Sequence, residues 1–252
     1  MKKGENTMKA IVLSAGYATR LYPLTKDTPK GLLPIGKKSI LDFITDQIET
    51  IAEIDEMFII SNHKFFTNFS DWAKTRDTRL KVTVLDDNTT DDSNKLGAIG
   101  DIWFTIENGN IDEDVLIMAG DNFFTFPLND YVDFYRQNSF DSILVKEINE
   151  IKELQRMANV IMDENGKVLA MEEKPQNPKS NCAAFASYIY RKDTLPMIKQ
   201  YLDEGNNPDA PGFFPSWLHD KKPVYAYKFQ GECYDIGTHD SYREVCEKFG
   251  EQ

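Results

Sequence analysis

The chain has 252 residues, of which 41% are hydrophobic and 28% are charged, with 14 Gly and 11 Pro. This composition excludes collagen-like, coiled-coil and disordered chains and is typical of a globular protein with a sizeable core. Lys and Arg number 29 against 41 Asp and Glu, a formal net charge of -12. Such an acidic chain is not expected to bind nucleic acid or an anionic membrane surface.

The ends and the cysteines of the chain suggest where the protein works. No segment approaches the roughly 20 apolar residues that a membrane span needs. Residues 1–7 are polar and no apolar run of signal-peptide length follows them, so we expect a disordered lead and a single domain over residues 8–252. The three cysteines are odd in number and lack metal-ligand spacing. We therefore expect a cytoplasmic protein.

Apolar runs and amphipathic segments alternate in the first part of the chain. Short apolar runs predict buried strands at residues 9–14, 57–60, 82–85, 115–118 and 142–145. Helical periodicity predicts helices at residues 40–54, 65–74, 97–107 and 128–137. Strands that alternate with helices indicate βαβ units. The sequence thus predicts an α/β fold with a Rossmann-like, mostly parallel sheet flanked by helices.

The rhythm changes after residue 150. A helix is predicted at residues 151–157, and shorter strands follow at 159–162, 168–172 and 185–190, the first two joined by a tight turn at 163–166. The remaining elements are a helix at 194–202, an irregular loop at 205–212, a strand at 224–228 and a helix at 238–249. These short strands predict a smaller antiparallel lobe.

The loop after the first strand is the most informative segment. Leu13, Ser14, Ala15 and Gly16 open it, and backbone N–H groups in a loop of small residues can approach phosphate oxygens closely. Arg20 and Lys30 follow in a stretch stiffened by Pro23 and Pro29. An ordinary turn with two surface cations is the alternative. The length of the loop, the two cations and the Pro-Lys pair together favour phosphate binding.

The loop fits neither common nucleotide motif. It lacks the G-x-x-x-x-G-K-[ST] of a Walker A loop and has only Gly16 where a dinucleotide fingerprint needs three glycines. Residues 13–30 instead resemble the G-x-G-T-R-x-x-P-x-T-x-x-x-P-K signature of the sugar-1-phosphate nucleotidyltransferases, and the likeness continues through residues 32–35. The chain departs from it at residues 15–18 (A-G-Y-A), where thymidylyltransferases usually show Gly-Gly-x-Gly.

Three later segments carry the same resemblance. Residues 119–122 (A-G-D-N) match the family's G-D-N, which makes Asp121 an expected Mg²⁺ ligand on the nucleotide. Residues 172–175 (E-E-K-P) and 178–181 (P-K-S-N) look like the block in which Lys174 would contact the sugar phosphate and Glu173 the sugar hydroxyls. Residues 234–239 resemble W-x-D-x-G-T, which makes Asp235 the second expected metal ligand. Four such segments in order are hard to produce by chance.

The resemblance implies a reaction in which a sugar 1-phosphate attacks the α-phosphorus of a nucleoside triphosphate and pyrophosphate leaves. A phosphate monoester is mostly dianionic at neutral pH and needs no general base. Catalysis then consists of positioning and charge neutralisation. Arg20 is expected to grip the β- and γ-phosphates, Lys30 to neutralise charge near the triphosphate and Lys174 to hold the incoming phosphate, with Mg²⁺ on the two aspartates.

Recognition of the base and the acceptor is harder to predict. Residues 95–100 correspond to the family's G-x-A-x-A segment, in which the backbone at Gly97 would lie against the base. The Gln that reads a pyrimidine in thymidylyltransferases is missing, and Asp92 or Asn94 stands in that neighbourhood. The later blocks still favour dTTP or UTP. The family's Tyr-Gly-Val-Val appears as residues 157–160, so Ala158 and Asn159 are expected to contact the acceptor.

Three alternatives stay open beside this interpretation. A cytidylyltransferase of a non-sugar phosphate such as phosphocholine would keep the chemistry and change the acceptor. A non-catalytic homologue that senses nucleotide sugars would not need all of the predicted cations and carboxylates. A glycosyltransferase could use the acidic residues 86, 87, 91 and 92, which we interpret instead as a solvent-exposed loop. Association into a homo-oligomer is also left open.

Overall fold

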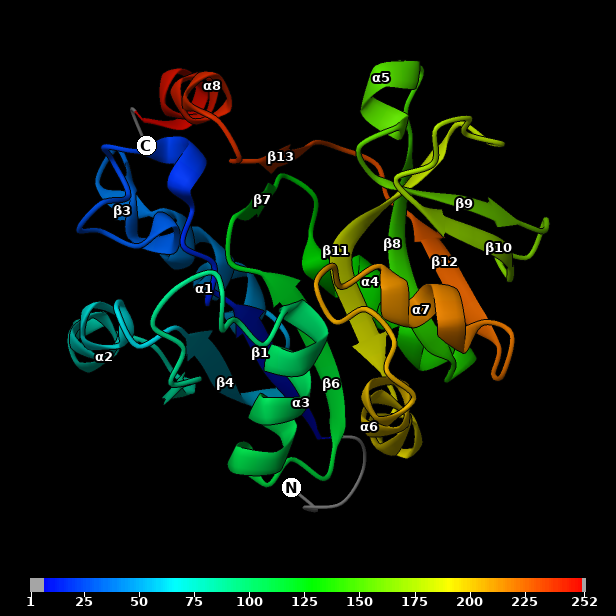
Figure 1. Ribbon diagram of the computed structural model, residues 1–252, viewed down its shortest axis with the longest axis horizontal. Coiled ribbons are helices and arrows are strands. Elements are labelled where there is room, and N and C mark those ends of the chain that lie inside the picture. Colours follow the sequence, from blue (N-terminus) through cyan, green and yellow to red (C-terminus); the bar gives the residue numbers. More distant parts are fainter. Residues whose placement is uncertain (1–6, 251–252) are drawn as a thin grey trace.

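The computed structural model describes residues 7–250, apart from the side chain of Phe123. Residues 1–6 of the expected lead therefore lie outside the described residues. Nine strands of the described chain form one mixed sheet in which β1 (Met8–Leu13) lies between β4 (Ile54–Ser61) and β6 (Asp114–Ala119), and β5 (Lys81–Asp86) follows β4 (Figure 1). These four strands are parallel. Their carboxyl ends consequently meet at one edge, where α/β sheets bind ligands.

The second half of the sheet is antiparallel. β11 (Cys182–Tyr190) pairs with β6 in the opposite direction and with β8 (Asp141–Glu147). Its first residues pair with β9 (Ala158–Met162), which carries β10 (Val168–Glu173) at its outer edge. β12 (Val224–Lys228) runs parallel to β8. The predicted α/β fold with an antiparallel lobe is confirmed, and the lobe continues the same sheet.

Helices cover both faces of the sheet because its central strands are apolar on both sides. Along β1, Ala10 and Val12 face one core cluster and Ile11 faces the other, the period-2 pattern of a strand buried on both faces. The first cluster receives residues of α1 (Ile40–Glu49), α2 (Phe66–Thr75), α4 (Leu128–Asn138) and α8 (His239–Phe249). The second receives residues of α3 (Ala98–Gly109), α6 (Leu195–Asp203) and α7 (Phe213–Leu218), which lie in front of the sheet in Figure 1.

Two predicted helices are shorter than the sequence pattern suggested. The helix expected at 40–54 is α1, which ends at Glu49, and the chain turns so that Ile54 already begins β4. The Thr50 hydroxyl donates to the Gln47 carbonyl at 2.7 Å and stabilises this turn. The helix expected at 151–157 is α5 (Ile151–Leu154), a single turn. After α1 the apolar periodicity continues because Ile51 and Ile54 are buried without being helical, whereas Gln155 and Arg156 after α5 are exposed.

Short elements escaped the sequence analysis altogether. They are the 3₁₀ helices η1 (Thr19–Leu21), η2 (Lys30–Leu32) and η3 (Lys192–Thr194), the hairpin of β2 (Pro34–Ile35) and β3 (Lys38–Ser39), helix α7, and the pair of β7 (Asn122–Phe124) and β13 (Cys233–Asp235). Elements of two or three residues are too short to show a period. None of the described helices has both the length and the apolar character that crossing a membrane would require.

A buried carboxylate holds the start of β8 against the end of β11. Asp141 is fully buried and accepts hydrogen bonds from the Arg191 N–H and the Thr194 hydroxyl, both at 2.8 Å. Lys222 Nζ lies 3.1 Å from the same carboxylate and 2.8 Å from Asp193. Burial raises the pKa of Asp141, and Arg191, Lys222 and Thr194 oppose that effect. The network fixes three segments that are distant in sequence.

Replacing this carboxylate should therefore cost much more than replacing its exposed neighbour. Asp141→Ala leaves buried donors without an acceptor, and we expect a loss of about 3 kcal/mol in the free energy of unfolding. Asp193→Ala removes an exposed partner of Lys222 and of the Arg191 guanidinium and should cost less than about 1 kcal/mol. Urea unfolding followed by circular dichroism measures both. Equal losses in the two variants would show that the Asp141 network is not what holds these segments.

Candidate active site

A cleft of about 1430 Å³ runs between the parallel and the antiparallel halves of the sheet. It brings together most of the residues that the sequence singled out, although they come from both halves. The predicted residues among its lining are Leu13, Ala15, Gly16, Arg20, Gly97, Asp121, Ala158, Glu173, Lys174 and Asp235. Ser14, Lys30 and Asn159 are not among the lining residues.

Hydrogen bonds from Asn62 and Thr25 fix the backbone of the loop after β1. The Asn62 amide, after β4, donates to the Ala15 carbonyl at 2.8 Å, and the Thr25 hydroxyl donates to the Ala18 carbonyl at 2.7 Å. Ala18 adopts a left-handed conformation with φ +49°. Gly120 lies so close that a side-chain carbon there would come within 2.2 Å of Ser14 Oγ. The loop is thus fixed in place beside the carboxyl end of β6.

Ser14 itself is turned away from the cleft. Its hydroxyl oxygen is buried against Gly120 and has no hydrogen-bond partner among the described residues. Its backbone N–H donates to the Ile60 carbonyl at 3.0 Å, which continues the pairing of β1 with β4. The predicted contact of Ser14 with a nucleotide stays a prediction, and the structure gives its side chain a packing position.

One ammonium group lies between the two predicted metal ligands. Lys30 Nζ is 2.6 Å from Asp121 Oδ2 and 4.0 Å from Asp235 Oδ1. The two carboxylates meet because β7 pairs with β13 and because the Ile236 N–H donates to the Asp121 carbonyl at 3.2 Å. Desolvation within the cleft and the charge of Asp121 raise the pKa of Asp235, whereas Lys30 and Arg20 lower it.

The two carboxylates suit a hard cation that keeps most of its ligands from elsewhere. Magnesium usually takes one or two protein carboxylates and completes its shell with water and substrate phosphates. Within residues 7–250 no group of three or more His, Cys, Asp or Glu side chains has the arrangement of a closed metal site. Asp121 and Asp235 therefore fit Mg²⁺ that arrives with a phosphate ligand, and Lys30 balances part of their charge.

The antiparallel half contributes a carboxylate, Glu173, and an ammonium group, Lys174, from the end of β10. The Glu173 carboxylate is largely buried, and a side-chain carbon on Gly212 would come within 2.2 Å of its Oε2. Burial raises the pKa of Glu173, and Lys174, whose Nζ is 3.8 Å from its Oε1, opposes that effect. Lys174 has φ +49° and its N–H donates to the Met157 carbonyl at 3.1 Å. Its side chain is exposed and lines the cleft.

Asn159 has a different position from the one expected. Its side chain is buried, and its Oδ1 accepts from the backbone N–H groups of Lys179 and Ser180 at 2.9 and 3.1 Å. Its Nδ2 donates to the carbonyl groups of Ser180 and Cys182. The structure thus places Asn159 beneath the loop of residues 179–182 rather than at the cleft.

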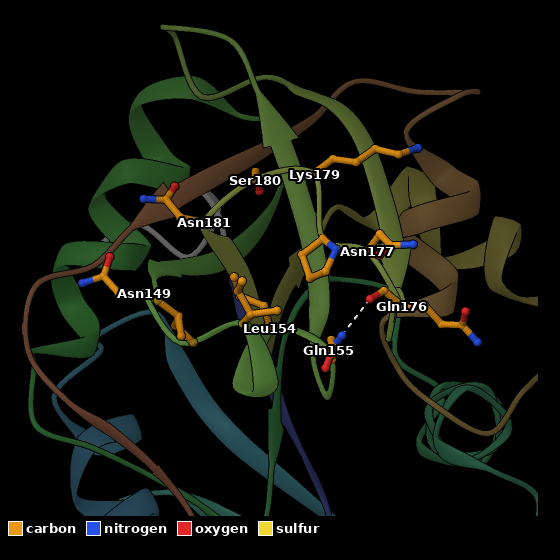
Figure 2. A pocket seen from close by; sticks show the side chains of 11 residues that line it. Asn149, Leu154, Gln155, Gln176, Asn177, Lys179, Ser180 and Asn181 are labelled. Atoms are coloured by element: carbon orange, nitrogen blue, oxygen red, sulfur yellow. Dashed lines mark hydrogen bonds between the residues drawn. The ribbon is translucent and has the colours of Figure 1, made fainter.

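The second half of the Glu-Glu-Lys-Pro…Pro-Lys-Ser-Asn block lines a separate, smaller pocket of about 470 Å³. Figure 2 shows this pocket between α5 and the loop of residues 176–181, where the Gln155 amide donates to the Gln176 carbonyl at 2.7 Å. Lys179 belongs to this pocket and does not line the cleft. This one sequence block therefore lines two separate pockets, and only its residues Glu173 and Lys174 line the cleft.

Gly97 lies where a distant loop closes against α3. It has φ +79°, and the N–H groups of Ala98 and Ile99 donate to the carbonyls of Asp209 and Pro208 at 3.3 and 2.9 Å. Lys95 Nζ forms an ion pair with Asp209 at 2.7 Å. The loop predicted at 205–212 thus caps the start of α3 and forms a wall of the cleft, and Gly97 is needed for that contact.

The interpretation of residues 86–92 as a solvent-exposed loop is wrong for Asp87. Asp87 is only 5% exposed and lines the cleft beside Asp101, which is 8% exposed and lies in the first turn of α3. Burial and the charge of Asp87 raise the pKa of Asp101 to about 8. Asp101 was not predicted as a site residue, although it lies in α3 beside the buried Ile102 and Thr105.

Comparison with known proteins gives a consistent result. Residues 9–252 match the family described as "Nucleotidyl transferase". The chain is 28% identical to glucose-1-phosphate adenylyltransferase of Acetivibrio thermocellus, over 93% of this chain and 58% of that protein. It is 30% identical to the protein of that name from Bacillus cytotoxicus, over 94% of this chain and 66% of that protein. The chain thus spans less than two thirds of the length of these relatives.

Solved structures share the fold. A Bacillus anthracis protein assigned as a glucose-1-phosphate thymidylyltransferase, in complex with sucrose, matches with a TM-score of 0.82 and 21% identity over 98% of this chain and 96% of that one. A UDP-glucose pyrophosphorylase complexed with UDP-glucose matches with a TM-score of 0.82 and 20% identity, over 97% of this chain and 99% of that one. At these identities the likeness shows the fold alone.

The contact at Gly97 can be tested with a matched pair of glycine variants. Gly97→Ala would place a side-chain carbon 2.6 Å from the Pro208 carbonyl oxygen and would also strain a positive φ. Gly205→Ala, at φ +76°, meets no atom within 4 Å and carries only the backbone penalty of about 1–2 kcal/mol. Thermal unfolding should show a clearly larger loss for Gly97→Ala. Equal losses would mean that the 205–212 loop can move away from residue 97 without a cost in stability.

Proposed function

The chain belongs to the nucleotidyl transferase family, and on that premise we propose that it couples a nucleoside triphosphate to a sugar 1-phosphate, giving a nucleotide sugar and pyrophosphate with the help of Mg²⁺. One observation carries the proposal. Lys30 lies between Asp121 and Asp235 in a cleft that also receives Arg20 from one half of the sheet and Lys174 from the other. Two cationic side chains that reach one cleft from different halves of the sheet suit two phosphorylated substrates.

The chemistry needs charge control more than proton transfer. A phosphate oxygen of the sugar 1-phosphate forms a bond to the α-phosphorus, and the bond from that phosphorus to its bridging oxygen breaks, so that pyrophosphate leaves with the electron pair. Lys174 would hold the incoming phosphate as a compact point charge, and Arg20 would grip the departing phosphates through its planar fork. Magnesium, when bound to Asp121 and Asp235, neutralises charge on the phosphate oxygens.

Lys30 and Glu173 would act as positioning groups in this scheme. Lys30 keeps the two like-charged carboxylates together before any cation binds, since it contacts one and approaches the other. The Glu173 carboxylate, held against Gly212, is an acceptor for sugar hydroxyls next to the phosphate that Lys174 would bind. Glu173 and Lys174 are adjacent in sequence and both line the cleft, which supports a shared role at the acceptor.

Two kinds of base compete, a pyrimidine and adenine. The Glu-Glu-Lys-Pro block resembles that of thymidylyltransferases and favours dTTP or UTP, whereas the relatives in A. thermocellus and B. cytotoxicus are named for adenylyl transfer. Pyrophosphate release measured for five nucleoside triphosphates against several sugar phosphates and phosphocholine tests the whole proposal. Release with phosphocholine alone would favour the cytidylyltransferase alternative, and no release with any pair would contradict nucleotidyl transfer.

The carboxylate pair gives a direct test of the metal requirement. Asp121→Asn and Asp235→Asn should each lower kcat by a factor on the order of 10² or more, because the amide carries no charge to hold Mg²⁺ against the phosphates. Asp240→Asn, an exposed change five residues beyond Asp235, is the control and should leave kcat within about twofold. Steady-state pyrophosphate release over a Mg²⁺ titration measures this. Full activity of both variants, or of the wild type in EDTA, would refute the assignment.

The two cations that line the cleft, Arg20 and Lys174, should separate by substrate. Arg20→Ala should raise KM for the nucleoside triphosphate, and Lys174→Ala should raise KM for the sugar phosphate by about 10-fold or more, since a charge-assisted contact is worth on the order of 1.5–3 kcal/mol. Lys179→Ala serves as the control because Lys179 lies in the same sequence block but outside the cleft. An effect of Lys174→Ala on the nucleotide alone would place the acceptor elsewhere.

A further inference from the structure

Two carboxyl groups, those of Asp87 and Asp101, face each other in the cleft. In the order of strands across the sheet, β5 beside this pair is farthest from β10, which Lys174 follows. Asp87 follows β5, the outermost parallel strand, and Asp101 belongs to the first turn of α3. Both line the cleft although each is more than nine-tenths buried. Neither forms an ion pair with a lysine or arginine in the described part of the chain. A buried acid pair without a cation calls for a partner of another kind.

The hydrogen bonds of the pair are incomplete. Asp87 Oδ1 accepts from the Thr89 N–H at 2.7 Å, and the two carboxyls interact with each other. Asp101 Oδ1 is buried and has no hydrogen-bond partner among residues 7–250. An orphaned buried oxygen of this kind is costly unless a ligand satisfies it. The remaining capacity of the pair consists of oxygen lone pairs, so it presents acceptors to a ligand.

The protonation state supports this view. Burial and the neighbouring charge of Asp87 raise the pKa of Asp101 to about 8, so Asp101 carries a proton at neutral pH. The charged group nearest to it is Asp87, whose own pKa is raised by burial and lowered by its bonds to Thr89. A proton shared between the two acids occupies the facing oxygens. The oxygens that point away from that shared proton are left to accept.

The position of the pair matches the base end of a nucleotide. The loop after β1 is tied to the turn that follows Asp87, because the Tyr17 hydroxyl lies 3.4 Å from the Thr89 hydroxyl. The proposed triphosphate site at Arg20 and Asp121 occupies the middle of the cleft, and Lys174 and Glu173 come from the antiparallel side. A nucleotide whose phosphates lie in the middle and whose acceptor lies on the antiparallel side must point its base toward β5 and α3.

We propose that Asp87 and Asp101 accept hydrogen bonds from the amino group of the nucleobase, so that the site takes triphosphates of adenine, cytosine or guanine in preference to UTP and dTTP. This inference rests on the proposed nucleotidyl transfer. Adenine, cytosine and guanine each carry an exocyclic amino group that donates to a carboxylate. Uracil and thymine have no exocyclic amino group. A carbonyl oxygen in its place would face the carboxylate oxygens, and an acceptor facing an acceptor leaves both unsatisfied.

The test compares equilibrium binding of ATP, CTP, GTP, UTP and dTTP to the full chain with Mg²⁺ and no acceptor, by isothermal titration calorimetry. At least one amino-bearing triphosphate should bind tenfold or more tightly than both UTP and dTTP. This first comparison uses the wild type and depends on no variant. Equal affinities, or tighter binding of UTP or dTTP, would overturn the inference.

Variants then assign the preference to the acid pair. Asp87→Asn and Asp101→Asn each introduce an amide donor that can meet a carbonyl oxygen of uracil, so the ratio of affinities should fall at least tenfold in one or both. Asp91→Asn changes an exposed acid of the same stretch that does not line the cleft, and should leave the ratio unchanged. Thermal unfolding confirms that each variant is folded. A ratio that is unchanged in both folded variants would overturn the role of the pair.

The readouts keep this inference separate from the proposed function. A base preference that disappears in the variants, together with no pyrophosphate release with any sugar phosphate, would support the acid pair and contradict nucleotidyl transfer. Pyrophosphate release that is equally efficient with all five triphosphates would support transfer and overturn the acid pair. Failure of every triphosphate to bind would overturn both.

Discussion

The contact of Lys30 with Asp121 and Asp235 is the interaction around which the cleft is organised. Two carboxylates that are far apart in sequence repel each other at close range, and an ammonium between them offsets that repulsion. The backbone makes the arrangement possible, since β7 and β13 pair directly beside it. The last part of the chain is thereby brought back across the carboxyl end of β6, and α8 continues from there to pack against the hairpin of β2 and β3, where the Tyr242 hydroxyl donates to the Pro34 carbonyl at 2.6 Å. The central ion cluster and the closure of the fold are thus one feature.

The overall charge of the chain gives this cluster a further consequence. A protein with a net charge of -12 repels polyanions at long range. The two phosphorylated substrates that we propose would need cations gathered locally. Arg20 and Lys174 line the cleft, and Lys30 lies beside it against Asp121. Screening at physiological ionic strength, with a Debye length of about 8 Å, restricts the general repulsion to short range. Local placement of a few cations can therefore outweigh the opposite sign of the whole molecule.

The sequence predicted those parts of the fold that depend on long regular patterns. Strands such as β1 and β6 were found because apolar runs bounded by small residues are typical of buried parallel strands. The pairing of β7 with β13 was not found, since three residues show no period, yet it is this pairing that joins Asp121 to Asp235. Asn159 shows another limit. Its place in a motif was legible, but the direction of its side chain depends on the loop of residues 179–182 that folds over it.

Asp87 and Asp101 show why burial was the hardest property to read. An acidic stretch is solvent-exposed in most proteins, and only the fold reveals that Asp87, after β5, is buried together with Asp101 in the first turn of α3. The position of this pair relative to Asp121 and Asp235 also matters for the chemistry. Asp87 follows β5 and Asp101 lies on α3, whereas Asp121 precedes β7 and Asp235 ends β13, so the two pairs of acids share no element of secondary structure. If the first site reads the base and the second handles the phosphates, the choice of base can change through a few side chains at one edge of the sheet. The charge cluster that transfer depends on would stay as it is.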